Sequence, residues 1–459
     1  MNLIDKHSYK VYNNMNNRGG VMKHIGKYLS LLVCIITAVG TLIACGPAGC
    51  SSTGYSGDGW YRPDFGKEME ARDDAKGREH IEIPNDATTI VIGEEEYNVV
   101  RNCDDFDREK NNILANDISI NYYYCLGKHK FNGNNYKFYG DYSGSPILNS
   151  VENSTIENVV FSSNIISGHN NFKGLIDTAK NTIIRNCVNY FSTASLPQSY
   201  AQGGTIIFEA YNCTIENVIN YGDMRFGSGI CDNAFEGTVI KDCVNYGNLS
   251  YSKDQWYDDD SHDYPIGGIV GRIRGDVQIK NCINYGNIIG KIFCGGIVGF
   301  NANEANWIYE AISYKATENY TDGQIIENCE NYGNIYLKLA SGANEISYAQ
   351  NPSCSRYYKE FEKLKWNDRV GIWYDAGANV TGIGGIAGFA SKIRNCKNHG
   401  AFYGFNKLED DLYVDYCGGI AGIAREITDC ETDYTIDNIQ KGRALNVGNL
   451  AGYILDENN

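Results

Sequence analysis

A short phrase recurs eight times along this chain of 459 residues: isoleucine, any residue, asparagine or aspartate, then cysteine or valine. Repetition at intervals of roughly 20 to 50 residues is typical of solenoids, in which each supersecondary unit stacks on the next. The alternative, an antiparallel sandwich, gives no reason for equivalent residues to return in phase. The copies begin at Ile156, Ile184, Ile215, Ile240, Ile279, Ile326, Ile393 and Ile427.

Two further phrases accompany the first. Most copies continue as Asn-Tyr-Gly, and Gly-Gly-Ile followed by Val-Gly or Ala-Gly precedes several of them. The shortest interval, from Ile215 to Ile240, is 25 residues and fits one three-stranded turn. About nine or ten turns spaced about 4.8 Å apart would extend on the order of 45 Å. The sequence therefore predicts an all-β fold, a right-handed parallel β-helix with loop insertions along one edge.

The residues around the repeated isoleucine indicate which side chains face inward. Charged residues such as Arg185 and Lys241 follow the isoleucine, so that position is solvated and the isoleucine faces the core. The position after the cysteine also accepts charge, as at Glu330 and Lys397, and is expected outside. Strict alternation of side chains along one strand cannot place both of these positions outside. We therefore predict a corner at the intervening Asn or Asp, with that residue in the left-handed region.

In these phrases the chain resembles the GLUG-motif repeat proteins of bacterial surfaces, which are named for a Gly-hydrophobic-hydrophobic-Gly sequence such as 268–271. The stretch 131–140 looks like the hydrophobic-x-Gly-x-x-Tyr turn that often opens such helices. The resemblance covers roughly residues 110–455. It implies a β-helix, surface display and adhesion, and it brings no catalytic motif to this chain.

The N-terminus is typical of an export signal. Residues 29–44 form an uncharged apolar run that follows Lys23 and Lys27 and is short for a membrane span of about 20 residues. The run ends in Leu-Ile-Ala-Cys, which resembles the lipobox of bacterial lipoproteins and implies that Cys45 carries the acyl anchor. An uncleaved membrane anchor is the alternative. Met22 begins a more typical signal than Met1 does.

These features predict an exported chain that is lipid-anchored to the bacterial membrane, extracytoplasmic or at the cell surface. The predicted parts are a signal peptide over 1–44, the lipidated cysteine and a flexible tether over 45–80, a cap with the first coils over 81–150, and repeats over 151–459. The predicted insertions are 249–266, 301–323, 335–381 and 401–416.

Charge limits the partners of the mature chain. The first 44 residues hold five of the 40 basic residues and one of the 56 acidic ones, so the remainder carries a net charge of −20. Such a chain repels nucleic acid and anionic headgroups over most of its surface. We therefore expect no nucleic-acid partner, and membrane attachment through acyl chains on Cys45.

The cysteines and acids do not predict a metal site or a cofactor. Six cysteines share one repeat position that valine fills in two copies, which favours buried free thiols over disulfides. No Cys-x-x-Cys pair is present and the histidines of the mature chain are dispersed, so a structural zinc site is not expected. The acidic run 258–263 could hold Ca²⁺, but it lacks the glycine spacing of a calcium loop and is more typical of a solvated charge run.

The insertions are the expected carriers of function, because loops on a rigid scaffold can vary without disturbing the core. Three of them interrupt the repeat at the same place and should gather aromatic rings and acids along one edge. Such rings are common in glycan and protein contact surfaces, although packing of the insertions against the scaffold is the alternative. The candidate ligand-binding residues are Trp256, Tyr257, Tyr357, Tyr358, Trp366 and Trp373.

Two function classes remain open. The first is a binding or adhesive module for a glycan or a host or matrix protein. The second is a polysaccharide lyase or glycoside hydrolase, which needs paired carboxylates, or a basic residue beside bound calcium, on adjacent coils. The repeated outward positions alternate among Arg, Glu and Lys without a cluster of acids, so the sequence favours a binding protein that is not an enzyme.

Overall fold

The structure is a computed structural model, and it divides into two compact units, Met1–Asp74 and Ala75–Asn459. All residues described below belong to the second unit. The predicted signal peptide, Cys45 and the tether up to residue 79 lie outside the described residues. The described residues are 80–119, 124–126, 128–139, 148–162, 174–192, 206–225, 227–250, 265–290, 293–301, 323–337, 382–403, 414–433 and 444–454.

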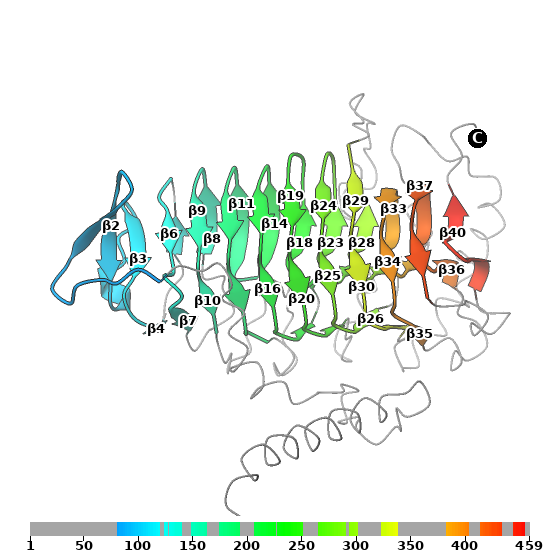
Figure 1. Cartoon of the computed structure of the whole chain (residues 1–459), viewed down its shortest axis with the longest axis horizontal. Helices are drawn as coiled ribbons and strands as arrows, with labels where there is room; N and C mark the ends of the chain where they lie inside the picture. Colours follow the sequence, from blue (N-terminus) through cyan, green and yellow to red (C-terminus); the bar gives the residue numbers. More distant parts are fainter. Residues whose placement is uncertain are drawn as a thin grey trace, which may run out of the picture. The chain divides into compact units, whose positions relative to one another are not determined.

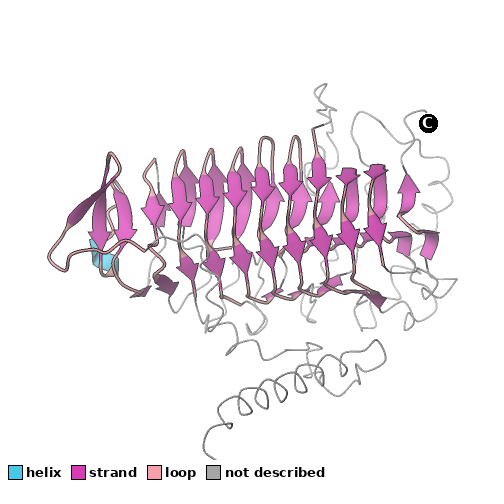
Figure 2. Cartoon of the chain, viewed as in Figure 1, coloured by secondary structure: helices cyan, strands magenta, loops and turns pink. Residues whose placement is uncertain are grey.

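Short strands are the main element of the described chain (Figure 2), and the one helical element within these segments is a single 3₁₀ turn, η1 (Cys103–Asp105). Strands of successive turns lie side by side, so that the second unit winds into a parallel β-helix (Figure 1). Equivalent repeat residues pair in register, with Ile215 opposite Ile240 and Ile240 opposite Ile279. The predicted fold class is therefore confirmed.

Two columns of strands form the largest sheet. β33 and β37 each contribute to both columns. The first column contains β5 (Tyr124–Leu126), β8 (Leu148–Glu152), β11 (Ile176–Lys180), β14 (Ile207–Tyr211), β18 (Cys231–Ala234), β23 (Val270–Ile273), β28 (Val298–Asn301), β33 (Ala387–Arg394), β37 (Ala421–Thr428) and β40 (Ala451–Ile454). The second column adds β1 (Thr89–Ile92), β2 (Glu95–Val100), β3 (Asn111–Leu114), β6 (Phe131–Asn132), β9 (Thr155–Glu157), β12 (Ile183–Arg185), β15 (Thr214–Glu216), β19 (Val239–Lys241), β24 (Gln278–Lys280) and β29 (Ile325–Glu327).

Three further columns complete the turn. The third contains β4 (Ile118–Ser119), β7 (Lys137–Tyr139), β10 (Val160–Phe161), β13 (Val188–Asn189), β16 (Ile219–Asn220), β20 (Val244–Asn245), β25 (Ile283–Asn284), β30 (Glu330–Asn331), β34 (Lys397–Asn398) and β38 (Glu431–Thr432). The fourth contains β17 (Met224–Arg225), β21 (Leu249–Ser250), β26 (Ile288–Gly290), β31 (Ile335–Leu337) and β35 (Phe402–Tyr403). The fifth contains β22 (Ile266–Gly267), β27 (Phe293–Gly295), β32 (Gly382–Gly384), β36 (Val414–Gly418) and β39 (Ala444–Gly448).

An antiparallel hairpin begins the described part of the helix. β1 pairs antiparallel with β2, and β2 then pairs parallel with β3, the first strand of the regular stack. Tyr97, Val99 and Ile113 form a small buried cluster beneath the hairpin. The hairpin therefore covers one end of the stack, where an open sheet edge would otherwise expose unpaired backbone groups.

The interior is filled by the repeated isoleucine and by the residue three positions later. Seven of the eight isoleucines are at most 1% exposed, and Ile427, in the last copy, is partly buried. The cysteines that share the later position, from Cys187 to Cys396, are fully buried within the same core. The predicted inward direction of both side chains is confirmed.

The predicted corner lies at the Asn or Asp between them. In all eight copies this residue has a positive φ between 47° and 56°, as in Asn186 and Asp242. Asn and Asp adopt this left-handed region more readily than other residues with a side chain. A second corner at Asn153, Asn181 and Asn212, which the repeat phrase does not include, has the same conformation.

A second asparagine lies inside the helix in six successive turns. The asparagines of the Asn-Tyr-Gly phrase are 0% exposed, and each side-chain amide donates to the side-chain oxygen of the next across 2.7–2.8 Å. Each amide also donates to the carbonyl oxygen two residues later, as from Asn284 to Gly286 at 2.9 Å. Burial of these polar groups is therefore compensated by hydrogen bonds. The members are Asn189, Asn220, Asn245, Asn284, Asn331 and Asn398.

The structure corrects three details of the sequence analysis. From β19 onward, a described turn contains five short strands rather than three, because the Tyr-Gly and Gly-Gly phrases each separate a further strand. The ends of the predicted insertions belong to strands of the helix, because β21, β22, β28, β31, β35 and β36 pair in register with neighbouring turns. The outward position after the cysteine is buried at Val188, which lies in register between Val160 and Ile219, so that each aliphatic side chain shields the next.

Candidate functional site: the outer face of the helix

The aromatic residues predicted to bind a ligand lie outside the described residues. Trp256, Tyr257, Tyr357, Tyr358, Trp366 and Trp373 all fall in the gaps 251–264 and 338–381. The strands that border these gaps are β21 and β22 for the first and β31 and β32 for the second. Both gaps, like 404–413, therefore separate a strand of the fourth column from one of the fifth. The described chain thus places the points where these segments leave the helix, but not the rings themselves.

A tyrosine ladder runs along the outer face of the third column. We use this name for Tyr190, Tyr221, Tyr246, Tyr285 and Tyr332, together with His399, which stack in this order. Neighbouring ring centroids are 4.5–5.2 Å apart, with interplanar angles of 7–17°. Each ring follows a buried asparagine of the third column, and alternation along the strand directs it outward.

Glycines hold the ladder at this spacing. A Cβ atom at Gly286, directly after Tyr285, would lie 1.9 Å from the carbonyl oxygen of Gly247 in the preceding turn. A Cβ atom added at the equivalent glycines 222, 247, 333 or 400 would likewise lie within 2.0 Å of a backbone oxygen of the preceding turn. At these five turns only glycine permits the close approach of the backbones beside the ring stack.

The solvent-exposed part of the ladder lies toward its C-terminal end. Tyr285 and Tyr332 are each 42% exposed, whereas Tyr221 is only 6% exposed. The Tyr332 hydroxyl donates to the Glu330 carboxylate across 2.6 Å, and this hydrogen bond raises the pKa of Tyr332 to about 12. His399 contacts the Asp433 carboxylate through Nδ1. This end therefore presents aromatic edges, hydroxyl groups and carboxylates together.

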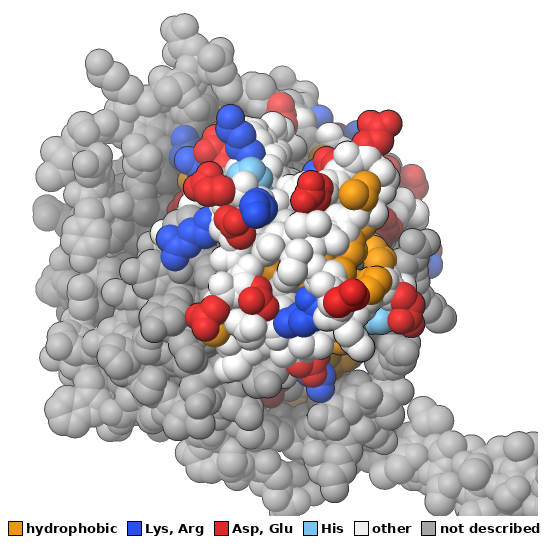
Figure 3. Space-filling model, turned by 90° about the vertical axis from the view of Figure 1, so that its left-hand side faces the viewer, with side chains coloured by type: hydrophobic (Ala, Val, Ile, Leu, Met, Phe, Trp, Pro, Cys, Tyr) orange, Lys and Arg blue, Asp and Glu red, His pale blue; other side chains and the backbone are white. Residues whose placement is uncertain are grey.

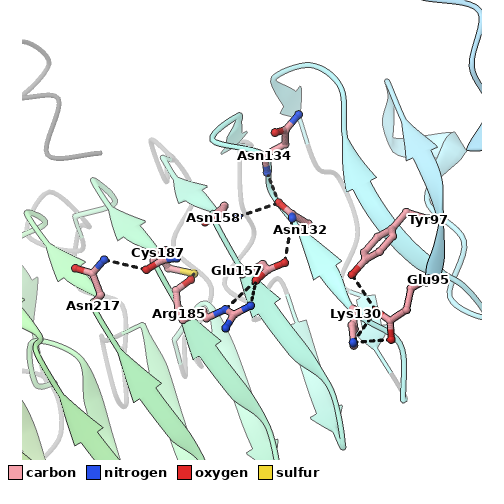
Figure 4. A network of polar contacts seen from close by, with 11 residues as sticks. Glu95, Tyr97, Lys130, Asn132, Asn134, Glu157, Asn158, Arg185, Cys187 and Asn217 are labelled. Atoms are coloured by element: carbon pink, nitrogen blue, oxygen red, sulfur yellow. Dashed lines mark hydrogen bonds and ion pairs between the residues drawn. The ribbon is translucent and has the colours of Figure 1, made fainter. Parts of the chain in front are cut away.

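Charged side chains of the second column pair between turns. Arg185 Nη2 lies 2.7 Å from Glu157 Oε2, and Lys241 Nζ lies 2.6 Å from Glu216 Oε2. Figure 4 shows Glu157 between Arg185 and Asn132 of the two adjacent turns. At the end that carries β1 and β2, acidic and basic side chains are likewise mixed (Figure 3). The acidic side chains described in this paragraph are thus paired with basic ones, whereas a catalytic or metal-binding group would require several acids close together.

One buried carboxylate departs from this pattern. Asp232 in β18 is 2% exposed and accepts a hydrogen bond from Asn233 Nδ2 at 3.0 Å, while Arg272 Nη1 donates to Asn233 Oδ1 at 3.3 Å. Burial raises the pKa of Asp232 to about 6, against the lowering effects of Arg272 and Asn233. Glu209 lies in register with Asn233 on the adjacent turn. Two carboxylates with different environments are the usual pair in glycoside cleavage, but here one of them is shielded from solvent.

Neither a group of metal-ligating side chains nor a membrane-spanning helix is found among the described residues. Among them, no three His, Cys, Asp or Glu side chains gather so as to hold a metal ion. No helix among the same residues is long and apolar enough to cross a membrane. The acidic run 258–263, considered above for Ca²⁺, lies outside the described residues.

Comparison with known proteins adds little to the fold. No family model and no curated protein sequence matches the chain. A solved structure named "IgA1 Protease" aligns with 71% of this chain at 12% sequence identity and a TM-score of 0.31. The alignment covers 19% of that protein, so this chain spans about a fifth of its length. At this level of similarity no residue or activity is transferred from that enzyme.

Sequence reasoning missed the tyrosine ladder and the buried carboxylate. The recurrence of tyrosine after asparagine was available as a signal, because tyrosine occupies this outward position in five consecutive turns. Asp232 gave no such signal, since its turn contains Cys-Asp-Asn-Ala where later turns have Val-Gly.

Proposed function

We propose that this chain is a membrane-anchored, surface-exposed lipoprotein that acts as a binding or adhesive module for a glycan or protein ligand. The acyl anchor at Cys45, export and the GLUG resemblance form part of this proposal and rest on the sequence alone. The observation that carries the proposal is the tyrosine ladder, a regular and partly exposed aromatic surface supported by a rigid stack. Tyrosine is enriched in contact surfaces because it combines a large apolar ring with a hydroxyl group.

The periodicity of the ladder favours an extended ligand. Tyr246, Tyr285 and Tyr332 repeat at 5.0 Å, so a linear glycan or an extended peptide can meet an equivalent group at each turn. The stacked rings present their edges and hydroxyl groups rather than their faces, which favours hydrogen bonding by polar chains. The aromatic residues predicted in the insertions would add further contacts along the edge between the fourth and fifth columns.

A glycan-cleaving enzyme is the second candidate, and one observation favours it. The carboxyl group of Asp232 has a raised pKa, as a general acid requires, and Glu209 supplies a second carboxylate on the adjacent turn. A general acid must come within hydrogen-bond reach of its substrate, however, and Asp232 is 2% exposed. We therefore propose binding without cleavage and assign Asp232 a structural role.

A glycan and matrix-protein array tests the proposal. We would compare the detergent-solubilised full chain with the double variant Tyr285→Ala, Tyr332→Ala and with the triple variant Trp256→Ala, Trp366→Ala, Trp373→Ala. We expect specific binding by the full chain and a loss of at least tenfold in affinity in the tyrosine variant. Tyr211→Ala is the matched control and should retain binding, because Tyr211 is a partly buried tyrosine of β14 that stacks on Phe235 outside the ladder. Equal binding by the full chain and both multiple variants would contradict the proposal.

A further inference from the structure

The cysteines of the repeat form a thiol ladder that ends near the surface. Cys243, Cys282, Cys329 and Cys396 are fully buried free thiols on successive turns, and Cys430, on the next turn, is a partly buried free thiol. No described strand of the second or third column follows β37 and β38, because β39 and β40 belong to the fifth and first columns. Cys396 and Cys430 are thus the ladder pair with one member within reach of solvent.

The two sulfurs occupy equivalent positions. Cys396 Sγ lies 3.2 Å from the Arg394 carbonyl oxygen, and Cys430 Sγ lies 3.3 Å from that of Thr428. The Cys329 backbone N–H donates to Cys396 Sγ at 3.4 Å, and the Cys396 N–H donates to Cys430 Sγ at the same distance. Equivalent atoms on successive turns are separated by about one coil spacing, ~4.8 Å. A disulfide needs its sulfurs at about 2.05 Å, so oxidation of this pair would require a backbone shift.

The same spacing suits a bridging metal ion. A metal–thiolate bond is about 2.3 Å long for zinc, so two such bonds end to end span about 4.6 Å. Thiolates are soft ligands that select ions such as Cu(I), whereas structural zinc requires four ligands. The described residues provide no group of three metal-ligating side chains. We propose that Cys396 and Cys430 form a two-coordinate site for a soft monovalent cation of the Cu(I) and Ag(I) class.

Binding would exchange protons for the cation without any change of oxidation state. Each thiol releases its proton, each sulfur forms one bond to the cation, and the product is a bis-thiolate complex with one negative charge. The backbone N–H groups of Cys329 and Cys396 donate to the two sulfurs, and such donors favour the thiolate form. The neighbouring Cys396 side chain and burial nevertheless raise the pKa of Cys430, so the cation must displace the proton of this thiol. Because two protons are released for each cation, affinity should increase with pH.

Native mass spectrometry with Ag(I) tests the site directly. The reduced full chain would be titrated anaerobically with Ag(I) in the presence of a competing thiol, and compared with Cys396→Val and Cys430→Val. Valine occupies the same ladder position at Val159 and Val218, so these substitutions preserve the packing. Cys282→Val is the matched control, because Cys282 is fully buried with a neighbouring turn on each side.

We expect the wild-type chain and Cys282→Val to retain one more Ag(I) ion than either Cys396→Val or Cys430→Val. X-ray absorption of the Ag(I) complex should show two sulfur neighbours, and retention should increase between pH 6 and pH 8. The proposal would be overturned if both terminal variants retained the wild-type number of ions, or if the wild-type chain retained no more than they do. Thermal unfolding of the metal-free variants separates loss of the site from loss of the fold.

Discussion

Asparagine has two distinct roles in this helix. At the corner, as at Asn281, it adopts a left-handed backbone conformation with φ of 54°, and its amide donates to Asp242 Oδ1 at 3.0 Å. Inside the third column, as at Asn284, it is completely buried and hydrogen-bonded to the turns on both sides. The first role depends on backbone conformation and the second on the satisfaction of buried polar groups, so the two sites should respond differently to substitution.

The buried role predicts a large loss of stability in Asn284→Ala. The substitution removes the partner of Asn245 Nδ2, of Asn331 Oδ1 and of the Gly286 carbonyl oxygen. Each buried group left without a partner costs about 1–3 kcal/mol, so we expect a total loss of about 3 kcal/mol or more. Urea unfolding would measure the loss, with Lys280→Ala, at a partly exposed position of the same turn, as the control. A loss below about 1 kcal/mol would show that the amides are not the buried hydrogen-bonded ladder described here.

The corner role predicts that glycine and alanine differ at position 281. Asn281→Ala places an ordinary side chain in the left-handed region, at a cost of about 1–2 kcal/mol. Asn281→Gly removes the same amide hydrogen bond but adopts this conformation freely, so it should be the more stable of the two variants. The difference between their urea midpoints reports the cost of the left-handed backbone conformation, because both variants lack the same amide hydrogen bond. Equal midpoints would contradict a left-handed corner.

Asp232 predicts a pH dependence of a definite sign. Its folded-state pKa of about 6 lies above the ordinary 3.8, so the folded chain keeps a proton that the unfolded chain releases between these values. Stability contributed by this group is therefore present below pH 3.8 and is lost as the pH rises toward 6, by about 3 kcal/mol. Asp232→Asn should gain that amount relative to the wild type between pH 4 and pH 7. If the free energies of unfolding of the two proteins, measured in urea, changed in parallel with pH across this range, the raised pKa would be ruled out.

At the scale of the elements, the sequence predicts those columns of strands in which a charged residue marks the outward position. Arg185 and Glu330 identified the outward positions of the second and third columns, and the parity conflict between them located the corner. The fourth and fifth columns were not predicted because their strands are bounded by the Tyr-Gly and Gly-Gly phrases, which carry no charged residue to mark an outward position. The tyrosine ladder was missed because ring stacking depends on the distance between turns, which the order of residues along one turn does not show.

Close packing between turns predicts a severe effect of Gly286→Ala. The new Cβ would lie 1.9 Å from the Gly247 carbonyl oxygen and 2.7 Å from its carbon, both backbone atoms of the preceding turn. The turns must then separate, which disrupts the tyrosine and asparagine ladders together, and we expect a loss of more than about 3 kcal/mol. Gly93→Ala is the contrasting control, because no atom lies within 4 Å of its added Cβ and it incurs only the cost of a left-handed alanine. Similar losses in the two variants would contradict the tight stacking at Gly286.

At the scale of the whole second unit, each turn contacts mainly its neighbours, and the ladders continue through most of the described stack. Such a scaffold is stabilised by repetition and can carry insertions between the fourth and fifth columns without disturbing the core. The partly exposed Tyr285 and Tyr332 lie on the third column, adjacent in sequence to the fourth. This arrangement supports our proposal of a binding module whose ligand follows the axis of the helix.

The most direct test of that proposal is to recover a ligand after binding and measure its length. The immobilised full chain would be incubated with a panel of soluble polysaccharides and matrix proteins, and the retained material would be eluted and sized by chromatography. We predict that at least one member is retained and returns at its original length, with retention reduced by Tyr285→Ala, Tyr332→Ala. Shortened polysaccharide in the eluate would contradict binding without cleavage and direct attention to Asp232 and Glu209, and a panel with no retained member would contradict the binding function itself.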